Sequence, residues 1–180
     1  MRRTRVVGLF LFLMLPGAVV AEVVDSANDG FSLRHTVEIT ADADDVYRTL
    51  TRGVEDWWHP DHTFTGDSSN LRIEARGGGC FCEKLSKGGE VNHLTVVYAE
   101  PGKLLRMSGG LGPLQPLAVS GSMAFTLTEV DGITAVELTY TVGGYRPGGL
   151  EQWSEPVDSV LGTQLQRLER FVETGNPDRE

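Results

Sequence analysis

The chain has 180 residues, of which 40% are hydrophobic and 23% charged, a composition typical of one folded domain. Its formal net charge is −9, and beyond the first five residues Lys and Arg form no cluster with aromatic residues. A surface of this sign repels phosphate backbones, so we expect no nucleic-acid partner.

The first 21 residues have the features of a secretory signal peptide. Three arginines precede an apolar run over 6–20, and the small residue Ala21 follows it. The run is shorter than the ~20 residues that span a bilayer, and Pro16 interrupts it, so an uncleaved anchor is the less favoured alternative. We expect cleavage after Ala21, no stable membrane insertion afterwards, and a periplasmic or secreted protein.

Four segments follow from this interpretation. They are a signal peptide at 1–21, a polar lead-in at 22–30, one domain at 31–174 and a C-terminal tail at 175–180. The domain is long enough to bury a sizeable core.

The domain begins with a strand pattern and continues with a helical one. Apolar and polar residues alternate over 31–40, which predicts a half-buried strand. In 41–58 apolar residues recur at helical spacing, aspartates stand at the start, and Gly53 interrupts the pattern. This segment therefore predicts two short helices.

The rest of the domain predicts six strands and one long helix. Turn residues separate strands expected at 71–75, 80–85, 91–99, 103–108, 120–129 and 133–142. The last segment has apolar residues three and four apart, begins near Ser154 and stops before Gly175. We expect an α+β fold in which this helix packs over a cavity on a curved antiparallel sheet of about seven strands.

The order of these elements resembles the START-like, or SRPBCC, helix-grip superfamily. The segments that carry the resemblance are "EDWWHPDHTFTGD", "GGCFCE" and "VVYAEPGKLLRMSG", and the similarity spans about 31–174. Within the superfamily, the chain is most similar to the branch of the activator of the heat-shock ATPase. The resemblance implies a helix-grip fold whose pocket is covered by the tryptophan-bearing short helix. It does not select a function, because this fold serves carriers, hormone binders, cyclases and co-chaperones. An ATP-driven co-chaperone role does not fit an exported protein.

We expect the cavity to bind a small apolar or amphipathic molecule, without catalysis and without a cofactor. The candidate ligand-binding residues are lid aromatics and inward-facing strand residues: Trp57, Trp58, Phe64, Phe81, Glu83, Leu94, Val96, Met107, Met123, Phe125, Leu138 and Tyr140. Large aromatic side chains give apolar ligands a wide contact area. The alternative for Trp57 and Trp58 is that they only anchor their helix on the sheet.

Glu83 is a candidate because it places a carboxylate on an otherwise apolar strand face. A two-residue turn at 88–89 would place it opposite Leu94. A buried carboxylate must be paired or protonated. Possible ion-pair partners are Arg72, Arg76 and Arg106. Glu83 is then a ligand anchor, a member of a structural ion pair or an acid/base, and it faces solvent instead if the turn register is off by one. If Glu83 is an acid/base, the protein is a small cofactor-free enzyme, cyclase-like or hydrolase-like, that uses Glu83 with His62 or Tyr140.

Cys80 and Cys82 are the only cysteines, one residue apart on an expected strand. Export favours a disulfide. On a regular strand, however, Cβ atoms two residues apart are separated by roughly 6.5 to 7 Å, and a disulfide needs roughly 3.5 to 4.5 Å. We therefore expect two free thiols, with a disulfide possible only if a bulge forms near 77–79.

No metal site is expected. His59 and His62 are close in sequence, but Pro60 breaks the helical register that would aim both at one ion. His93 is expected on the strand face that carries the two cysteines, which is a weak pattern for a metal.

Overall fold

The structure is a computed structural model that describes residues 20–179. One antiparallel sheet has the strand order β1-β2-β8-β7-β6-β5-β4-β3. Its strands are β1 (Val20–Ala27), β2 (Gly30–Ile39), β3 (Leu71–Ile73), β4 (Cys80–Lys84), β5 (Glu90–Glu100), β6 (Leu104–Ser108), β7 (Ala118–Val130) and β8 (Ile133–Tyr145). The helices are α1 (Ala43–Arg52), α2 (Val54–Trp57) and α3 (Ser154–Thr174), with one-turn helices η1 (Pro60–His62), η2 (Ser68–Asn70), η3 (Gly112–Leu114) and η4 (Glu151–Trp153).

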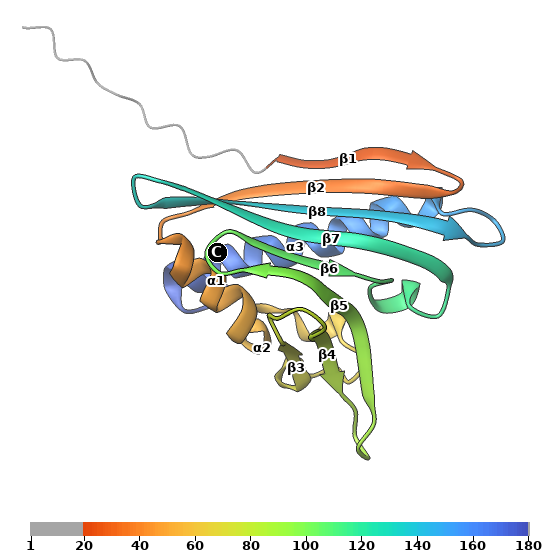
Figure 1. Ribbon diagram of the computed structural model, residues 1–180, viewed down its shortest axis with the longest axis horizontal. Helices are drawn as coiled ribbons and strands as arrows, with labels where there is room; N and C mark the ends of the chain where they lie inside the picture. Colours follow the sequence, from red (N-terminus) through yellow and green to blue (C-terminus); the bar gives the residue numbers. More distant parts are fainter. Residues whose placement is uncertain (1–19, 180) are drawn as a thin grey trace, which may run out of the picture.

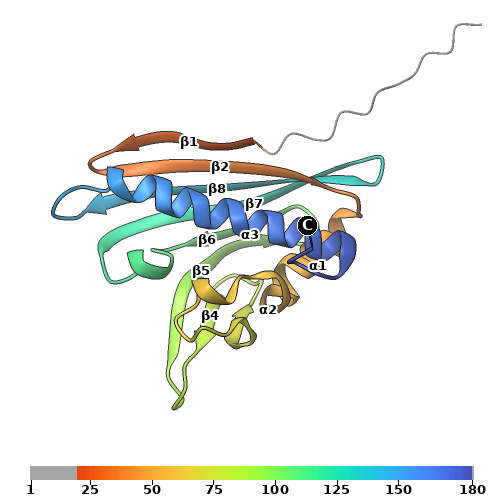
Figure 2. The same ribbon diagram turned by 180° about the vertical axis from the view of Figure 1, so that it is seen from behind.

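The sheet curves around α3, which lies across one of its faces (Figures 1 and 2). The fold class is therefore α+β with a long C-terminal helix over an antiparallel sheet, as the sequence predicts. Both short helices follow the strand over 30–39, and Gly53 separates them. In the part of the chain that the structure describes, no helix is long and apolar enough to cross a membrane.

The sheet has eight strands, one more than the sequence pattern predicts. The additional strand is β1, which takes up most of the expected polar lead-in at 22–30. It pairs antiparallel with β2 along the sheet edge, with Val23 opposite Leu33 and Ala27 opposite Gly30. Its register shifts after Val23, so the period-two pattern that marks the other strands is interrupted here. Most of the expected signal peptide, 1–19, lies outside the described residues.

The long helix α3 begins and ends where the sequence predicts. Gly175 follows it in a left-handed conformation, with φ of 71°, and donates its N–H to the Phe171 carbonyl, an ending that favours glycine. Leu161, Leu165 and Leu168 are buried against the sheet. Inward residues of β2, β7 and β8 complete the core, which the alternating pattern of those strands predicts.

β4 and β5 pair with an irregularity that the sequence analysis missed. Phe81 lies opposite Leu94, whereas Glu83 lies opposite Val91, so β5 has one residue more than β4 in this stretch. The additional residue is His93, which forms a β-bulge. The expected register, with Glu83 opposite Leu94 and His93 beside the cysteines, is therefore wrong. The bulge places the His93 ring next to Glu83 instead.

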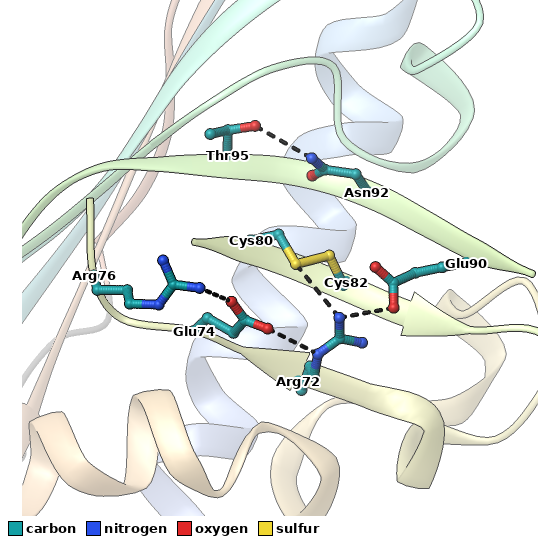
Figure 3. The surroundings of a disulfide bond; sticks show 8 residues. All are labelled: Arg72, Glu74, Arg76, Cys80, Cys82, Glu90, Asn92 and Thr95. Atoms are coloured by element: carbon teal, nitrogen blue, oxygen red, sulfur yellow. Dashed lines mark hydrogen bonds and ion pairs between the residues drawn. A yellow bond between two sulfur atoms is a disulfide. The ribbon is translucent and has the colours of Figure 1, made fainter. Parts of the chain in front are cut away.

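Cys80 and Cys82 form a disulfide, which corrects the expectation of two free thiols (Figure 3). Their Cα atoms are 5.4 Å apart, within the range that disulfides span and shorter than the roughly 6.6 Å of a regular strand. The strand is contracted at Phe81, opposite the bulge. Arg72 lies beside the disulfide, with Nη2 3.8 Å from Cys80 Sγ and 2.7 Å from Glu90 Oε2.

Candidate functional site

A cavity of about 250 Å³ lies between the first half of α3, the segment after α2, strands β4 and β5, and the loop that carries η3. Its walls are almost entirely aromatic and aliphatic side chains. Of the residues predicted to bind a ligand, Trp58, Phe64 and Phe81 line it.

The aromatic wall is built by the segment that follows α2. The ring of Trp58 packs edge-on against Phe81, with centroids 5.1 Å apart, and its Nε1 donates to the His62 carbonyl at 3.0 Å. Phe64 stacks on the ring of His93 at 5.7 Å and is 57% exposed. Phe64 therefore forms the rim of the cavity, while Trp58 and Phe81 lie deeper.

The opposite wall comes from η4, from α3 and from the η3 loop, and the sequence analysis proposed none of these residues as ligand-binding. They include Leu111, Pro113, Leu114, Trp153, Val157 and Val160. The α3 residues follow the predicted apolar spacing. The apolar stripe on this helix is wider than packing on the sheet requires, and this width is the feature of the sequence that could have indicated a cavity wall. The loop residues stand in "GGLGPLQP", which gives no periodic signal.

Tyr140 fixes the η3 loop and does not line the cavity. Its hydroxyl donates to the Gly109 carbonyl at 3.0 Å and accepts from the Leu111 N–H at 2.9 Å. Burial raises the pKa of Tyr140 to about 12, although the Leu111 hydrogen bond acts in the opposite direction. Tyr140 is thus a neutral positioning residue, and both its hydrogen-bonding roles are already filled.

Glu83 is completely buried and holds the rim segment in place. Its Oε1 accepts from the Thr65 N–H at 2.7 Å, and its Oε2 accepts from the Phe64 N–H at 2.9 Å. The Nε2 atom of His93 lies 3.0 Å from the same Oε2. None of the arginines considered as partners is the counterpart. Arg72, for example, pairs with Glu74 and Glu90.

The charge state of this pair follows from its surroundings. Burial raises the pKa of Glu83, but the hydrogen bonds from Phe64, Thr65 and His93 outweigh it, and the pKa is lowered. Burial lowers the pKa of His93, and the opposing effect of Glu83 is smaller. At neutral pH the pair is therefore a carboxylate and a neutral imidazole. The carboxylate accepts, so we assign the imidazole proton to Nε2.

His62 also lines the cavity, next to the rim. The buried Gln164 side chain of α3 accepts from the His59 N–H at 2.8 Å and donates to His62 Nδ1 at 2.9 Å. Burial and the nearby His59 lower the pKa of His62, and Asp61 opposes them. Gln164 thereby ties the rim segment to α3.

The remaining predicted ligand-binding residues form the core around the cavity rather than its lining. They are Trp57, Leu94, Val96, Met107, Met123, Phe125 and Leu138, all buried. Trp57 donates its Nε1 proton to the Thr49 carbonyl at 3.1 Å, which ties α2 to α1 rather than to the sheet. Glu83 lies one layer behind the wall, in contact with His93.

Among residues 20–179, one group of potential metal ligands comes close together, Cys80, Cys82 and Glu90. The disulfide engages both sulfurs, and Glu90 pairs with Arg72. Thiolate is the form of cysteine that binds metals, so this arrangement does not fit a metal ion.

No protein-family model and no curated protein matches the chain. Several solved structures match the chain. The conserved protein of unknown function EF2215 from Enterococcus faecalis matches with a TM-score of 0.61 and 17% identity, over 90% of this chain and 80% of its own. The Aha1 dimer structure from Colwellia psychrerythraea matches with a TM-score of 0.56 and 17% identity, over 80% and 97%. CalU16 from Micromonospora echinospora matches with a TM-score of 0.57 and 17% identity, over 90% and 88%.

These likenesses define the fold class. The chain shares with these structures a helix-grip-like fold, here with an eight-stranded antiparallel sheet and a long C-terminal helix. The identities are too low to carry a function from any of these proteins to this chain.

Proposed function

We propose that the protein binds a small apolar or amphipathic molecule in the cavity under α3, without chemical change. The observation that carries the proposal is the cavity itself, about 250 Å³ and lined by aromatic and aliphatic side chains. An apolar cavity of roughly 150 Å³ accepts benzene. The larger volume here suits a molecule of about two fused rings.

Binding is tested by native mass spectrometry of the purified protein and by calorimetric titration with two-ring aromatic compounds. Val160 lines the cavity, and Val160→Trp should fill it and weaken binding at least tenfold. Ser159→Trp is the matched control, because Ser159 is the exposed neighbour on the same helix and should leave affinity unchanged. Equal affinity in both variants, or no binding by the unmodified protein, would contradict the proposal.

We also propose that the protein acts after export, in the periplasm or outside the cell. The basic, apolar and small-residue pattern of 1–21 supports this, as does the disulfide, which is typical of oxidising compartments. N-terminal sequencing of the protein from a periplasmic fraction should begin at Glu22. Recovery of an intact Met1 from the cytoplasmic fraction would refute export.

The Glu83–His93 pair favours a second candidate, a cofactor-free hydrolase-like enzyme. A carboxylate that orients an imidazole is a common general-base arrangement. In this candidate His93 replaces His62 and Tyr140 as the partner of Glu83. The test is hydrolysis of 1-naphthyl acetate. A rate above that of buffer that is lost in His93→Phe would support an enzyme, and equal rates for both proteins would exclude this one.

A further inference from the structure

We propose that Cys80 and Cys82 form a redox-active site, which oxidises dithiol substrates by disulfide exchange. This activity is separate from the proposed binding function. Phe81, between the two cysteines, lines the cavity from β4, whereas the disulfide lies on the other side of that strand (Figure 3).

The disulfide joins no separate parts of the fold. Its cysteines are two positions apart in one strand, and β3 and β5 pair with that strand on its two sides. In the chain-entropy account, a cross-link stabilises a fold by closing a loop of the unfolded chain, and the shortest loops gain least. The bond therefore contributes little to folding, and its opening and closing are compatible with the folded state.

The two sulfurs differ in their access to solvent. Cys82 is completely buried, whereas Cys80 is partly exposed. The backbone of Cys80 is engaged on both sides, since it lies opposite Thr95 on β5 and its carbonyl accepts from the Glu74 N–H at 2.9 Å. The exposed part is therefore mainly the side chain, which is one methylene group and the sulfur. A thiolate in solution can reach Cys80 and cannot reach Cys82.

A guanidinium lies beside the accessible sulfur. Arg72 on β3 donates from Nη2 to Cys80 Sγ at 3.8 Å (Figure 3). Glu74 and Glu90 hold the guanidinium there, at 3.3 Å and 2.7 Å. A cation in contact with a cysteine favours its thiolate form. Arg72 therefore stabilises the reduced site once the bond has opened, which makes the disulfide a better oxidant.

Glu90 is the opposing charge at this site. One of its carboxylate oxygens lies within 4.8 Å of both sulfurs and disfavours a thiolate. Its Oε2 atom is paired with Arg72, however, and the guanidinium is in direct contact with Cys80. Because the nearer charge has the larger effect, we expect the balance at Cys80 to favour the thiolate.

The exchange uses two thiols of the substrate. The first, as a thiolate, attacks Sγ of Cys80 and forms a mixed disulfide, and the electron pair of the broken bond leaves on Cys82, which takes up a proton. The second substrate thiolate attacks the substrate sulfur of this mixed disulfide and expels Cys80 as a thiolate beside Arg72. The substrate dithiol thereby loses two electrons and two protons and becomes a disulfide, while the site becomes a dithiol. Glutathione disulfide can reoxidise the site by the reverse exchange.

The first test places the folded protein in about 10 mM reduced and 0.1 mM oxidised glutathione and reads its redox state by alkylation and intact mass. A structural disulfide stays oxidised under these conditions, whereas the bond between Cys80 and Cys82 should be at least half reduced. The oxidised protein should also convert an equimolar peptide with two cysteines to its disulfide in a single turnover. The Cys80→Ser/Cys82→Ser protein is the control and should convert none.

Single-cysteine variants test which sulfur is attacked. In native Cys82→Ser, Cys80 should form a mixed disulfide with glutathione when glutathione disulfide is added, which intact mass detects. In native Cys80→Ser, Cys82 should form no such adduct until the protein is denatured, because it is buried.

The contribution of Arg72 is measured in the Cys82→Ser background. Arg72→Gln should lower the alkylation rate of Cys80 at neutral pH about fivefold and move the pH profile of that rate upward. Arg76→Gln is the matched control, because Arg76 also pairs with Glu74, at 2.8 Å, but is bonded to no sulfur in the part of the chain that the structure describes. It should change the rate less than twofold.

Three results would overturn the proposal. They are a bond that stays oxidised in the glutathione buffer, a dithiol peptide that is not oxidised, and equal glutathione adducts on the two native single-cysteine variants. If Arg72→Gln changes the alkylation rate no more than Arg76→Gln does, the argument that the site is an oxidant fails. None of these measurements uses a cavity ligand, so their outcome is independent of the proposed binding function.

Discussion

At the scale of single residues, the buried Glu83 side chain holds two backbone groups and one imidazole ring in place. Three donors converge on this carboxylate, the N–H groups of Phe64 and Thr65 and the Nε2 of His93. Glu83→Ala leaves all three unpaired in a buried place, so we expect a loss of about 3 kcal/mol in unfolding free energy. Glu83→Gln keeps one accepting oxygen and should lose about 2 kcal/mol. Urea unfolding measures both.

Glu137→Gln is the control for this prediction. Glu137 is a carboxylate on the exposed sheet face, paired with Arg34 at 3.4 Å. Exposed pairs of this kind contribute little, so the change should stay within about 0.5 kcal/mol. Equal losses for Glu83→Gln and Glu137→Gln would show that the three hydrogen bonds to Glu83 do not stabilise the fold.

The sequence identified Glu83 as unusual but could not identify its partner. A carboxylate on an apolar strand face signals a buried polar group, which the structure confirms. The sequence predicts an arginine on a neighbouring strand as the partner, because regular pairing would place His93 on the other face of the sheet. The bulge at His93 depends on how β4 and β5 pair, and no local pattern of residues predicts it.

At the scale of elements, the packing of α3 on β2 depends on one glycine. A Cβ atom at Gly162 would lie 2.9 Å from Cε1 of His35, a buried ring whose Nε2 is 2.9 Å from Asp158 Oδ1. Gly162→Ala improves helix propensity by about 1 kcal/mol, but it must push the helix off the sheet. We expect a net loss of about 1 to 2 kcal/mol in urea unfolding.

The matched control is Ser159→Ala on the same helix. Ser159 is exposed, so the alanine there contacts no strand and should leave stability unchanged or slightly raised. If Gly162→Ala stabilises the protein as well, the close approach between α3 and His35 is not as tight as the structure shows.

The disulfide in β4 gives a second prediction at this scale. Denatured protein that has not been reduced should take up no thiol-alkylating reagent, and reduced protein should take up two equivalents, as intact mass measures. Two alkylated cysteines without reduction would refute the bond. The bond closes a very short loop, so reduction should cost only about 1.5 kcal/mol in unfolding free energy. A Cys80→Ser/Cys82→Ser protein should be insensitive to reductant.

Most elements were predictable from sequence because their signals are local. The period-two strands, the two short helices and α3 between Ser154 and Gly175 all carry such signals. The edge strand β1 was missed, since an edge strand gains stability from backbone pairing with β2 rather than from an alternating pattern. The sequence predicts a cavity between the sheet and the long C-terminal helix, and the cavity lies there. Its lining, however, depends on which side chains α3 and the η3 loop bring opposite Phe81, and only the tertiary packing determines that.

At the scale of the whole molecule, the buried His93 should make the fold sensitive to mild acid. Burial lowers the pKa of His93 below the ordinary value of 6.5. The pKa of His62 is lowered too, but His62 is exposed, so solvent screening keeps its contribution to stability small. Below pH 6.5 the unfolded chain therefore binds protons that the folded protein does not bind. Stability should fall as the pH drops from 6.5 toward the folded-state pKa values, by at most about 1.4 kcal/mol per pH unit for each proton.

Glu83 adds a second stage below pH 4.5. Its lowered pKa gives stability that is present above pH 4.5 and is lost as the pH falls further. Glu169 acts in the opposite direction in the region above pH 4.5, because burial raises its pKa. The acid loss therefore begins with the histidines, and Glu83 contributes only at lower pH.

The measurement is urea unfolding of the unmodified protein and of His93→Phe from pH 8 to pH 4. Above pH 6.5 neither histidine titrates, so the two stability curves should run parallel and serve as the internal control. Between pH 6.5 and 5 the curve of His93→Phe should fall less steeply, because the variant lacks the proton that the unfolded chain binds at His93 and the folded protein does not. Curves that stay parallel over this range would show that burial of His93 does not destabilise the folded protein in acid. A variant curve that falls more steeply would assign the acid sensitivity to its loss of the Glu83 contact instead.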